Sequence, residues 1–482
     1  MDIFLQQFWP WIIAGLDLLL ATVTSSHAVL RKRDSRAAAG WVGLIWLTPF
    51  AGSMLYIWLG INRIERKAHR LRPAELADEI RRRAADHGQT ELECELHCGH
   101  LQSLAGLVGR MTGQPLCSDN QVTCLPGGGD AAYAAMLAAI DNATTSISLC
   151  VYIFANDRAG RVFAESLIRA TKRGVNVRVL VDDVGSGYSW RSGTDLFENS
   201  SVTVARFLPT LTPWRFQYSN LRNHRKVLIV DGSIGFTGGM NICEVNYRDI
   251  PEEQRAQDVH FELHGAVVHQ LQDAFVLDWS FTTGERLSGG LWYGPIESNG
   301  SVLARVISDG PDEDLDRLQS VILGAISCAK SHIVVVMAYF VPDHALISAL
   351  NMAAWKGVQV DIVLPSQVDV RLVRWASTAV LPHLLGSGCR IWLSEPPFDH
   401  SKLAVIDDTW SLIGSANWDQ RSLRLNFELN VECYDAALAG QLTGIAESRM
   451  ATATRVTTEW LQQQSLAVRL RNGLASLAAP FL

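Results

Sequence analysis

Two long runs of apolar residues occupy most of the first 62 positions of the chain. Residues 8–30 carry only Asp17 and His27 as ionisable side chains, and residues 37–62 carry no charged side chain. At about 1.5 Å of helix per residue, each run is long enough to cross about 30 Å of hydrocarbon. Tryptophans lie near the ends of both runs, as they do at membrane interfaces. The pattern predicts an N-terminal membrane hairpin within residues 1–70, with helices over residues 8–30 and 37–62.

Two other interpretations of the apolar runs agree less well with the sequence than the hairpin does. A pair of buried core helices would place an uncharged stretch of unusual length inside a soluble core. A cleaved signal peptide would begin with basic residues, whereas this chain begins Met1-Asp2-Ile3 and has two apolar runs. Asp17 is costly in lipid, so we expect it to face the second helix or the headgroup zone.

Basic residues follow each apolar run and bear on its orientation. Arg31, Lys32, Arg33 and Arg36 lie between the runs, and a larger basic cluster follows the second run. Because cytoplasmic loops carry an excess of lysine and arginine, the larger cluster favours a cytoplasmic position for the rest of the chain. Both clusters are suited to anionic lipid headgroups. The sequence therefore predicts a multi-pass membrane protein.

Beyond residue 125 the same order of strand, helix, turn and strand occurs twice. An apolar strand pattern at residues 147–154 is matched at 332–340, and a turn and strand at 173–181 are matched at 356–364. Alternating strands and helices of this kind predict sheets covered by helices. We therefore predict an α/β fold made of two duplicated halves. The predicted segments are a helical linker at 71–125, a first half at 126–295, and a second half at 296–482 that ends in a helical tail.

Each half contains the same motif, HxKxxxxD. An asparagine follows 17 residues after each motif histidine, shortly after a pair of small residues. One such motif is a weak indication, but two copies at matching places of a duplicated unit strongly indicate a functional site. The candidate site residues are His224, Lys226, Asp231, Gly239 and Asn241 in the first half, and His400, Lys402, Asp407, Ser415 and Asn417 in the second.

The spacing of the motif places complementary side chains together. The sequences VLIV and LAVI, which directly follow the motif lysines, are typical of strands. Side chains two residues apart share one face of a strand, so each half presents an imidazole and an ammonium on the same face. The small residues allow close approach of the backbone beside them. The asparagine amides can donate hydrogen bonds to anionic oxygen.

Phosphodiester transfer needs such a set of groups. A nucleophile attacks phosphorus, an acid protonates the departing alkoxide, and cations hold the oxygens whose charge redistributes. Neutral histidine is a competent nucleophile near neutral pH, and protonated histidine is a competent acid. Two motifs supply one of each, with two lysines and two asparagines as an electrostatic clamp. This chemistry requires no metal and no other cofactor.

Charge and cysteine content argue against several classes of function and site. The net charge is −7, whereas general nucleic-acid binders usually carry a basic excess, so no nucleic-acid partner is expected. Nine cysteines without regular spacing do not indicate a disulfide framework. Cys94, His97, Cys98 and His100 form a cluster that could hold zinc. Its spacing matches no usual zinc finger, so an ordinary helix is the favoured interpretation and no metal site is predicted.

Together these residues resemble the phospholipase D superfamily and, more narrowly, bacterial cardiolipin synthases. The resemblance includes the N-terminal hairpin, the stretch NHRKVLIVDGSIGFTGGMNI, the stretch DVHFELHG from Asp258, and the stretch GSANWDQRSLRLNFELN. It implies two phospholipase D-like α/β sandwich halves that form one active site between them. It also implies a covalent phosphatidyl-histidine intermediate.

The resemblance further implies roles for the site residues. His224 is the nucleophile, and His400 is the general acid that then becomes the base. The reverse assignment stays open, because the motifs are nearly symmetric. Glu428 is the candidate to hold His400 by its second ring nitrogen, and Glu262 is the candidate to hold His224. The motif aspartates are interpreted as supports at strand ends.

The expected activity is phosphatidyl transfer from one phosphatidylglycerol to another, which gives cardiolipin and glycerol. Delivery to water would make the protein a phospholipase D hydrolase, and another alcohol or phosphatidylethanolamine is an alternative acceptor. A nuclease and an inactive membrane scaffold are further alternatives. The acidic net charge and the hairpin count against the first, and the intact histidine and lysine pairs count against the second. The resemblance places the protein in the bacterial inner membrane, and its oligomeric state is left open.

Overall fold

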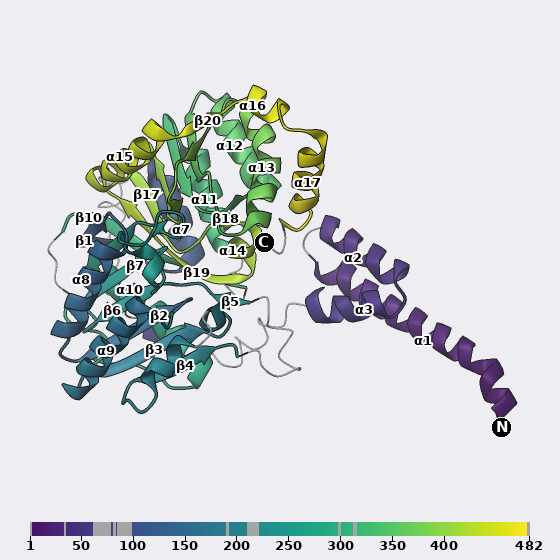
Figure 1. The fold of residues 1–482 in the computed structure, drawn as a ribbon, viewed down its shortest axis with the longest axis horizontal. Coiled ribbons are helices and arrows are strands. Elements are labelled where there is room, and N and C mark those ends of the chain that lie inside the picture. The colour runs from purple at the N-terminus through teal and green to yellow at the C-terminus, as the bar shows by residue number, and fades with distance from the viewer. Residues whose placement is uncertain are drawn as a thin grey trace. The chain divides into compact units, whose positions relative to one another are not determined.

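The computed structural model divides the chain into two compact units, which are described separately (Figure 1). The first consists of Met1–Lys67 and Thr210–Ser219, and the second of Ala68–Pro209 and Asn220–Leu482. The structure describes residues 2–32, 35–60, 79–80, 83, 99–188, 192–209, 221–296, 300–311 and 316–479.

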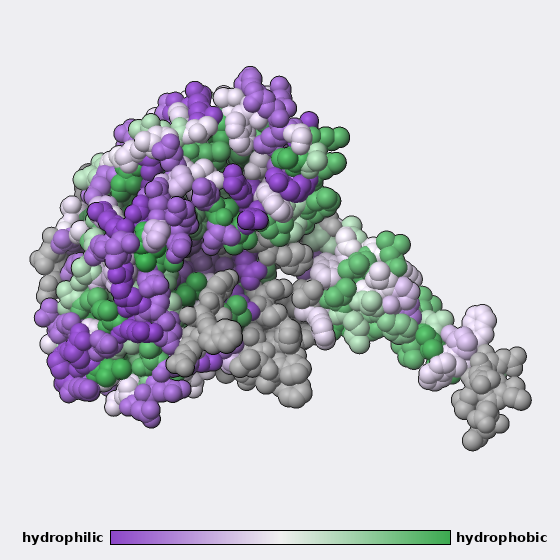
Figure 2. All heavy atoms as spheres, viewed as in Figure 1, coloured by the Kyte–Doolittle hydropathy of each residue, from purple (hydrophilic) through white to green (hydrophobic). Residues whose placement is uncertain are grey.

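The first unit begins with one long helix, α1 (Asp2–Arg31). Its segment Phe8–Arg31 is long and apolar enough to cross a membrane, and it is the one helix in the described ranges that meets both conditions. Most of its large apolar side chains are exposed, and Figure 2 shows hydrophobic residues along this unit. The helix predicted over residues 8–30 is therefore present.

The second apolar run does not form one continuous helix. Its pieces are α2 (Ser35–Leu47), the short helix α3 (Ala51–Leu55) and a π-helical turn at Tyr56–Gly60. Pro49 accounts for the break, because proline disfavours helical conformation at the preceding residue and has no N–H to donate. Asp17 Oδ1 accepts a hydrogen bond from the backbone N–H of Phe50 at 2.7 Å. Asp17 thus faces the second segment, as expected, whereas the prediction of an unbroken second membrane helix is wrong.

The second unit is built on one continuous mixed sheet that repeats a seven-strand order. In the first half the order is β4-β3-β2-β6-β7-β9-β1, and in the second half it is β14-β13-β11-β16-β17-β19-β10. Antiparallel pairing of β1 with β10 joins the halves (Figure 1). The matched order confirms the predicted duplication and the α/β fold class.

The strands are short, and most of their residues are buried. Those of the first half are β1 (Cys117–Leu125), β2 (Ser146–Val151), β3 (Asn176–Asp182), β4 (Thr203–Phe207), β6 (Val227–Val230), β7 (Ile234–Gly238) and β9 (His260–His264). Those of the second half are β10 (Val302–Asp309), β11 (His332–Met337), β13 (Gln359–Pro365), β14 (Arg390–Ser394), β16 (Lys402–Ile406), β17 (Trp410–Gly414) and β19 (Asn426–Tyr434), to which β20 (Thr454–Val456) adds an edge strand.

Helices cover the sheet, and each half has its own hydrophobic core. In the first half they are α8 (Gly129–Asn142), α9 (Arg158–Lys172) and α10 (Val267–Thr283). In the second half they are α11 (Arg317–Cys328), α12 (His344–Trp355), α13 (Arg371–Leu385), the short α14 (Gln420–Arg424) and α15 (Ala436–Thr452), followed by α16 (Thr458–Gln462) and α17 (Leu466–Ser476) as the predicted helical tail.

The end of the predicted linker belongs to the sheet. Residues 84–98 lie outside the described residues, and α7 (Gln102–Thr112) then leads into β1. β1 pairs with β9 on one side and β10 on the other. The prediction of a helical linker is therefore wrong for Cys117–Leu125. Its polar sequence CSDNQVTCL carries little strand signal, and pairing on both edges satisfies its backbone instead.

Two short strand pairs connect the halves near the motifs. β5 (Arg222–Asn223) runs parallel to the start of β19, and β8 (Ala256–Gln257) runs parallel to β15 (Phe398–Asp399). Each pair joins the residues before a motif histidine in one half to a strand of the other half. The chain entering each motif is therefore fixed by the opposite half.

Candidate active site

Both motif histidines are held by the backbone of the opposite half. The N–H of His224 donates to the carbonyl oxygen of Phe427 at 2.9 Å. In the same way, the N–H of His400 donates to the carbonyl oxygen of Gln257 at 2.8 Å. The two bonds are equivalent under the duplication, so the motifs of both halves contribute to one site.

Both motif lysines are buried and turn back toward their own histidine. Nζ of Lys226 donates to the carbonyl oxygen of His224 at 2.7 Å, and Nζ of Lys402 donates to that of His400 at 2.5 Å. The expected strand begins only after Lys226 in the first half and at Lys402 in the second. The spacing of two residues nevertheless brings an imidazole and an ammonium together in each half, as predicted.

A carboxylate from the opposite half holds each imidazole. Nδ1 of His224 lies 2.9 Å from Oε1 and 3.1 Å from Oε2 of Glu428. Nδ1 of His400 lies 3.0 Å from Oδ2 of Asp258. The predicted partners are therefore wrong: Glu428 serves His224 rather than His400. Glu262 contacts His264 at 2.8 Å on the same strand and does not hold His224.

The strand register explains why the predicted pairing fails. The glycine that ends β7 lies opposite His260, and the glycine that ends β17 lies opposite Asn430. Asp258 and Glu428 each stand two residues before these partners, so they occupy equivalent positions. The sequence Phe-Glu-Leu occurs at residues 261–263 and again at 427–429. Alignment of these two copies would pair Glu262 with Glu428, which is four residues away from this correspondence.

Neighbouring groups fix the two carboxylates in different ways. Oγ of Ser415 donates to Glu428 Oε2 at 2.5 Å, and Nδ2 of Asn426 donates to Oε1 at 3.1 Å. The residue equivalent to Ser415 in the first half is Gly239. A Cβ at Gly239 would lie 2.5 Å from Oδ2 of Asp258, so only glycine leaves room for this carboxylate.

The two predicted phosphate-binding asparagines differ in their contacts. Oδ1 of Asn241 accepts a hydrogen bond from the N–H of Ile153 at 3.1 Å, and Asn241 lines a cavity of about 300 Å³ together with His400. Asn417 is buried, and its Oδ1 has no hydrogen-bond partner in the described part of the chain. A buried amide oxygen without a partner is costly, which makes Asn417 a candidate for a bound ligand or water.

The motif aspartates stabilise the ends of strands rather than the motif histidines. The carboxylate of Asp231 accepts hydrogen bonds from the backbone N–H groups of residues 144–146, and that of Asp407 from residues 330–332. Both aspartates have a φ of 52°. Burial raises the pKa of Asp407, but the hydrogen bonds outweigh burial and lower it to about 2. This geometry agrees with the interpretation of the two aspartates as supports at strand ends, so they stabilise the structure around the site.

The candidate zinc cluster falls mostly outside the described residues. Cys94, His97 and Cys98 lie among the residues that the structure does not describe. His100 is described, and its Nε2 lies 2.6 Å from Oδ2 of Asp407. His100 therefore has a partner of its own at the end of a strand.

Comparisons with known proteins agree with this geometry. Residues 136–279 and 322–450, more than half of the chain, match the model of the family described as "Cardiolipin synthase, PLD-like domain". The chain belongs to this family. It is similar to the major cardiolipin synthase of Bacillus subtilis, with 29% identity over 97% of each chain. It is also similar to a cardiolipin synthase of Staphylococcus aureus, with 29% identity over 98% of this chain and 96% of the relative.

The fold of this family member also resembles a solved structure. The crystal structure of a phosphatidylserine synthase from Haemophilus influenzae has a TM-score of 0.61 and 15% identity, covering 79% of this chain and 100% of that chain. At this level of identity the likeness concerns the fold.

Burial controls the charges of the site in this cardiolipin synthase family member. Burial lowers the pKa of His224 to about 4, although the neighbouring Glu428 opposes the shift. Burial and the nearby ammonium of Lys402 lower the pKa of His400. Burial also lowers the pKa of Lys226 to about 7. His224 is therefore neutral at pH 7, which is the protonation state that a nucleophilic imidazole requires.

Arg225, which stands between the motif histidine and lysine, is a further residue of the site. Its guanidinium forms a buried ion pair with Asp278 at 2.7 Å and donates to the carbonyl oxygen of Glu428 at 3.0 Å and to Oγ of Ser308 at 2.6 Å. Arg225 thus ties the first motif to the second half. Only tertiary contacts reveal this role, because an arginine in that position carries no signal of its own.

His260 is a second residue of the site that sequence analysis did not single out. It is buried, and its Nδ1 has no hydrogen-bond partner among the residues described. Burial lowers its pKa to about 4, against the opposing charge of Asp258. In the sequence, the one signal that could have indicated a place of His260 in the site is its position two residues after Asp258, in the stretch DVHFELHG.

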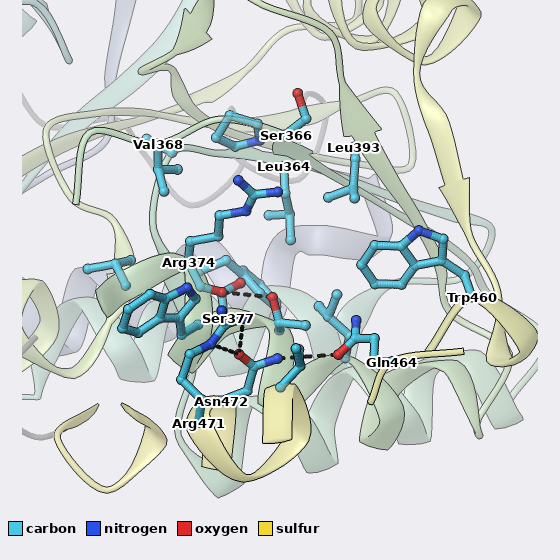
Figure 3. Close-up of a pocket in the computed structure, with 18 residues that line it drawn as sticks. Leu364, Ser366, Val368, Arg374, Ser377, Leu393, Trp460, Gln464, Arg471 and Asn472 are labelled. Carbon is cyan, nitrogen blue, oxygen red and sulfur yellow. Dashed lines mark hydrogen bonds between the residues drawn. The ribbon is translucent and has the colours of Figure 1, made fainter. Parts of the chain in front are cut away.

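A second cavity, of about 350 Å³, lies between α13, α16 and α17. In Figure 3 the side chain of Arg374 extends toward Leu364, and Trp460 stands on the other side of the cavity. Val368 lines both this cavity and the cavity that contains His400. The two cavities are therefore neighbours.

Gly239→Ala is expected to lower the turnover number by about 100-fold, the scale of a misplacement of about 1 Å in an active site. The added methyl group forces Asp258 away from His400. The matched control is Gly440→Ala on α15, where a Cβ meets no atom within 4 Å. Both variants are compared by the initial rate of phospholipid conversion. Equal rates for the two variants would contradict this role of Gly239.

Proposed function

We propose that the protein transfers a phosphatidyl group from one phosphatidylglycerol to another and releases glycerol, which makes it a cardiolipin synthase. The observation that carries the proposal is the pair of crossed contacts in which Glu428 holds His224 and Asp258 holds His400. Each contact occupies Nδ1, so Nε2 of each imidazole is left for substrate chemistry. The family membership of the chain and the names of its relatives support the lipid substrate.

In the first half-reaction, Nε2 of His224 attacks the phosphorus of the donor lipid. The bond from phosphorus to the oxygen of the headgroup glycerol breaks, and His400 gives its proton to that oxygen. The charge of the phosphate raises the pKa of the nearby His400 and favours the protonated form that this step needs. Glycerol then leaves, and the phosphatidyl group stays on His224.

In the second half-reaction, a hydroxyl group of the acceptor phosphatidylglycerol attacks the same phosphorus. Neutral His400 takes the proton of this hydroxyl group, and the bond from phosphorus to His224 breaks. The product is cardiolipin, and both histidines return to their starting protonation states. The reverse assignment of the two histidines is the alternative within this mechanism.

The other site residues act by electrostatics and position. Lys226 and Lys402 are buried beside the histidines, where a positive charge stabilises the non-bridging oxygens of the transition state more strongly than it does in water. Asn241 and Asn417 are the candidates to donate hydrogen bonds to the same oxygens. No step in this scheme uses a metal.

We further propose that residues 1–60 hold the protein in the bacterial inner membrane, with the catalytic unit on the cytoplasmic side. The apolar α1 and the basic residues that follow the second apolar segment support this placement. The substrate is then taken from the lipid of the same membrane.

The test is lipid analysis of phosphatidylglycerol vesicles incubated with the purified full-length protein. Cardiolipin and glycerol are expected in equal amounts from the wild type, and His224→Ala should lower this rate by at least about 10⁴-fold, as loss of a nucleophile does elsewhere. His264→Ala is the matched control, because His264 lies on β9 and pairs with Glu262 away from the motifs. Its rate should stay near that of the wild type.

Other products would identify other reactions. Phosphatidic acid in place of cardiolipin would overturn the transferase in favour of a hydrolase. Unchanged lipid with the wild type, under conditions in which the protein is folded, would overturn the lipid substrate. Full activity in His224→Ala would overturn the mechanism while leaving the overall reaction in place.

A further inference from the structure

The tail helix α17 has one face packed on the protein and the opposite face uncovered. On the packed face, Asn472 and Ala475 are buried, and Ala475 belongs to a small core with Val373 and Ala376 of α13. On the outer face, Leu466, Leu470, Leu474 and Leu477 are 70%, 59%, 67% and 75% exposed. Such a row of exposed leucines is not needed for the packing of this helix.

The helical period places these leucines in a single stripe. At about 100° per residue, the four leucines fall within an arc of about 80°, opposite Asn472 and Ala475. Figure 2 shows hydrophobic surface where α17 lies in Figure 1. A contiguous apolar stripe on an otherwise solvated helix indicates an interaction surface.

The charges of α17 identify the kind of partner. Arg469 and Arg471 lie on either side of the leucine stripe, each about 100° from its centre. The helix contains no acidic residue. A second copy of α17 packed on the same leucines would bring like charges together. An anionic lipid surface instead accepts the leucines in its apolar layer and Arg469 at its headgroups.

The packed side of α17, opposite the leucine stripe, borders a cavity. α17 forms one wall of the cavity drawn in Figure 3, to which Val468, Arg471 and Asn472 contribute. The guanidinium of Arg471 lies 4.5 Å from the ring centroid of Trp375, which lines the same cavity. This cavity shares Val368 with the cavity of His400, so the packed side of α17 lies on a cavity that adjoins the site.

We propose that α17 is an interfacial helix, which inserts its leucine stripe into the surface of an anionic bilayer. This contact is additional to the membrane segment at the N-terminus. It does not depend on the chemistry of the histidines, so it can be tested apart from the proposed function.

The test is site-specific photo-crosslinking in the full-length protein reconstituted into vesicles of phosphatidylglycerol and phosphatidylcholine. Leu470 is replaced by p-benzoylphenylalanine, and after illumination the peptide that contains this position is analysed by mass spectrometry. The matched control carries the same photo-reactive residue at Met352 on α12, which is 61% exposed, against 59% for Leu470. A phospholipid adduct is expected at position 470 and not at position 352.

A charge variant tests the role of Arg469. Arg469→Gln, combined with the photo-reactive residue at position 470, should lower the yield of lipid adduct by up to about fivefold in vesicles that contain phosphatidylglycerol. In vesicles of phosphatidylcholine alone, the same variant should have little effect. Crosslinks between two protein chains at position 470, absence of a lipid adduct there, or equal adducts at position 352 would each overturn the proposal. Adducts at position 470 without any phospholipid turnover would support α17 docking and overturn the proposed function alone.

Discussion

Glu428→Gln is expected to lower the turnover number by about 10²–10⁴-fold, the scale seen when the carboxylate that orients a catalytic histidine is replaced by an amide. Glu428 contacts Nδ1 of His224 and is itself fixed by Ser415 and Asn426. The amide keeps the shape of the side chain but removes the negative charge that stabilises an imidazolium and selects the tautomer. The measurement is the initial rate of cardiolipin formation, with circular dichroism to verify that the variant is folded.

The matched control for this prediction is Glu262→Gln. Glu262 belongs to the sequence Phe-Glu-Leu, which is repeated around Glu428, but it contacts His264 and is partly exposed. Its replacement should leave the rate within about twofold of the wild type, because an exposed pair contributes little. A large loss in Glu262→Gln together with a small loss in Glu428→Gln would contradict the crossed arrangement of the site.

The pH dependence of the rate separates an electrostatic role of Glu428 from a purely structural one. The neighbouring carboxylate raises the pKa of His224, in opposition to burial. Removing its charge should therefore lower the pKa of His224 still further, and the acid limb of the pH profile that reports His224 should move to lower pH. A loss of rate with an unchanged profile would indicate that Glu428 acts through structure alone.

Glu432→Ala is expected to lower the free energy of unfolding by about 3–5 kcal/mol, because it leaves a buried guanidinium without its counter-charge. Glu432 and Arg305 lie opposite each other on β19 and β10, and their side chains are 0% and 2% exposed. Nε of Arg305 donates to Glu432 Oε1 at 2.6 Å, and Trp410 donates to Oε2 at 3.1 Å. The measurement is chemical denaturation of the detergent-solubilised protein, followed by tryptophan fluorescence.

The control for the stability prediction is an ion pair at the surface. Arg158 and Asp249 form a hydrogen-bonded pair, but their side chains are 47% and 62% exposed. Water screens such a pair, so Asp249→Ala should leave the free energy of unfolding nearly unchanged. Similar losses in Glu432→Ala and Asp249→Ala would show that burial does not govern the strength of these interactions here.

The local sequence was sufficient to predict the duplication and the candidate reactive groups. The two HxKxxxxD motifs lie at matching places of the repeat, and a spacing of two residues brings each histidine and lysine together whether or not a regular strand has begun. The first apolar run was also predictable, because length and composition alone decide whether a helix can cross a bilayer. In the second run, the effect of Pro49 on the helix could have been read from the sequence, since proline acts on its immediate neighbours.

The partners of the histidines were decided by tertiary structure. The sequence repeat Phe-Glu-Leu suggested an alignment of Glu262 with Glu428, but the pairing of β7 with β9 and of β17 with β19 makes Asp258 the equivalent residue. A shift of four residues within a strand leaves its hydrophobic alternation unchanged, so the sequence pattern cannot detect it. The crossed contacts also depend on the short strand pairs between the halves, which join segments more than 140 residues apart.

The sequence by itself determined which groups are the candidates for the chemistry of this protein, because histidine, lysine and small residues at fixed short spacings have local consequences. Tertiary structure alone decided which carboxylate orients which histidine, why Gly239 must lack a side chain, and which face of α17 stays uncovered. These features arise from contacts between segments that are distant in the chain. Their physical basis is register and packing, which no local pattern of residues encodes.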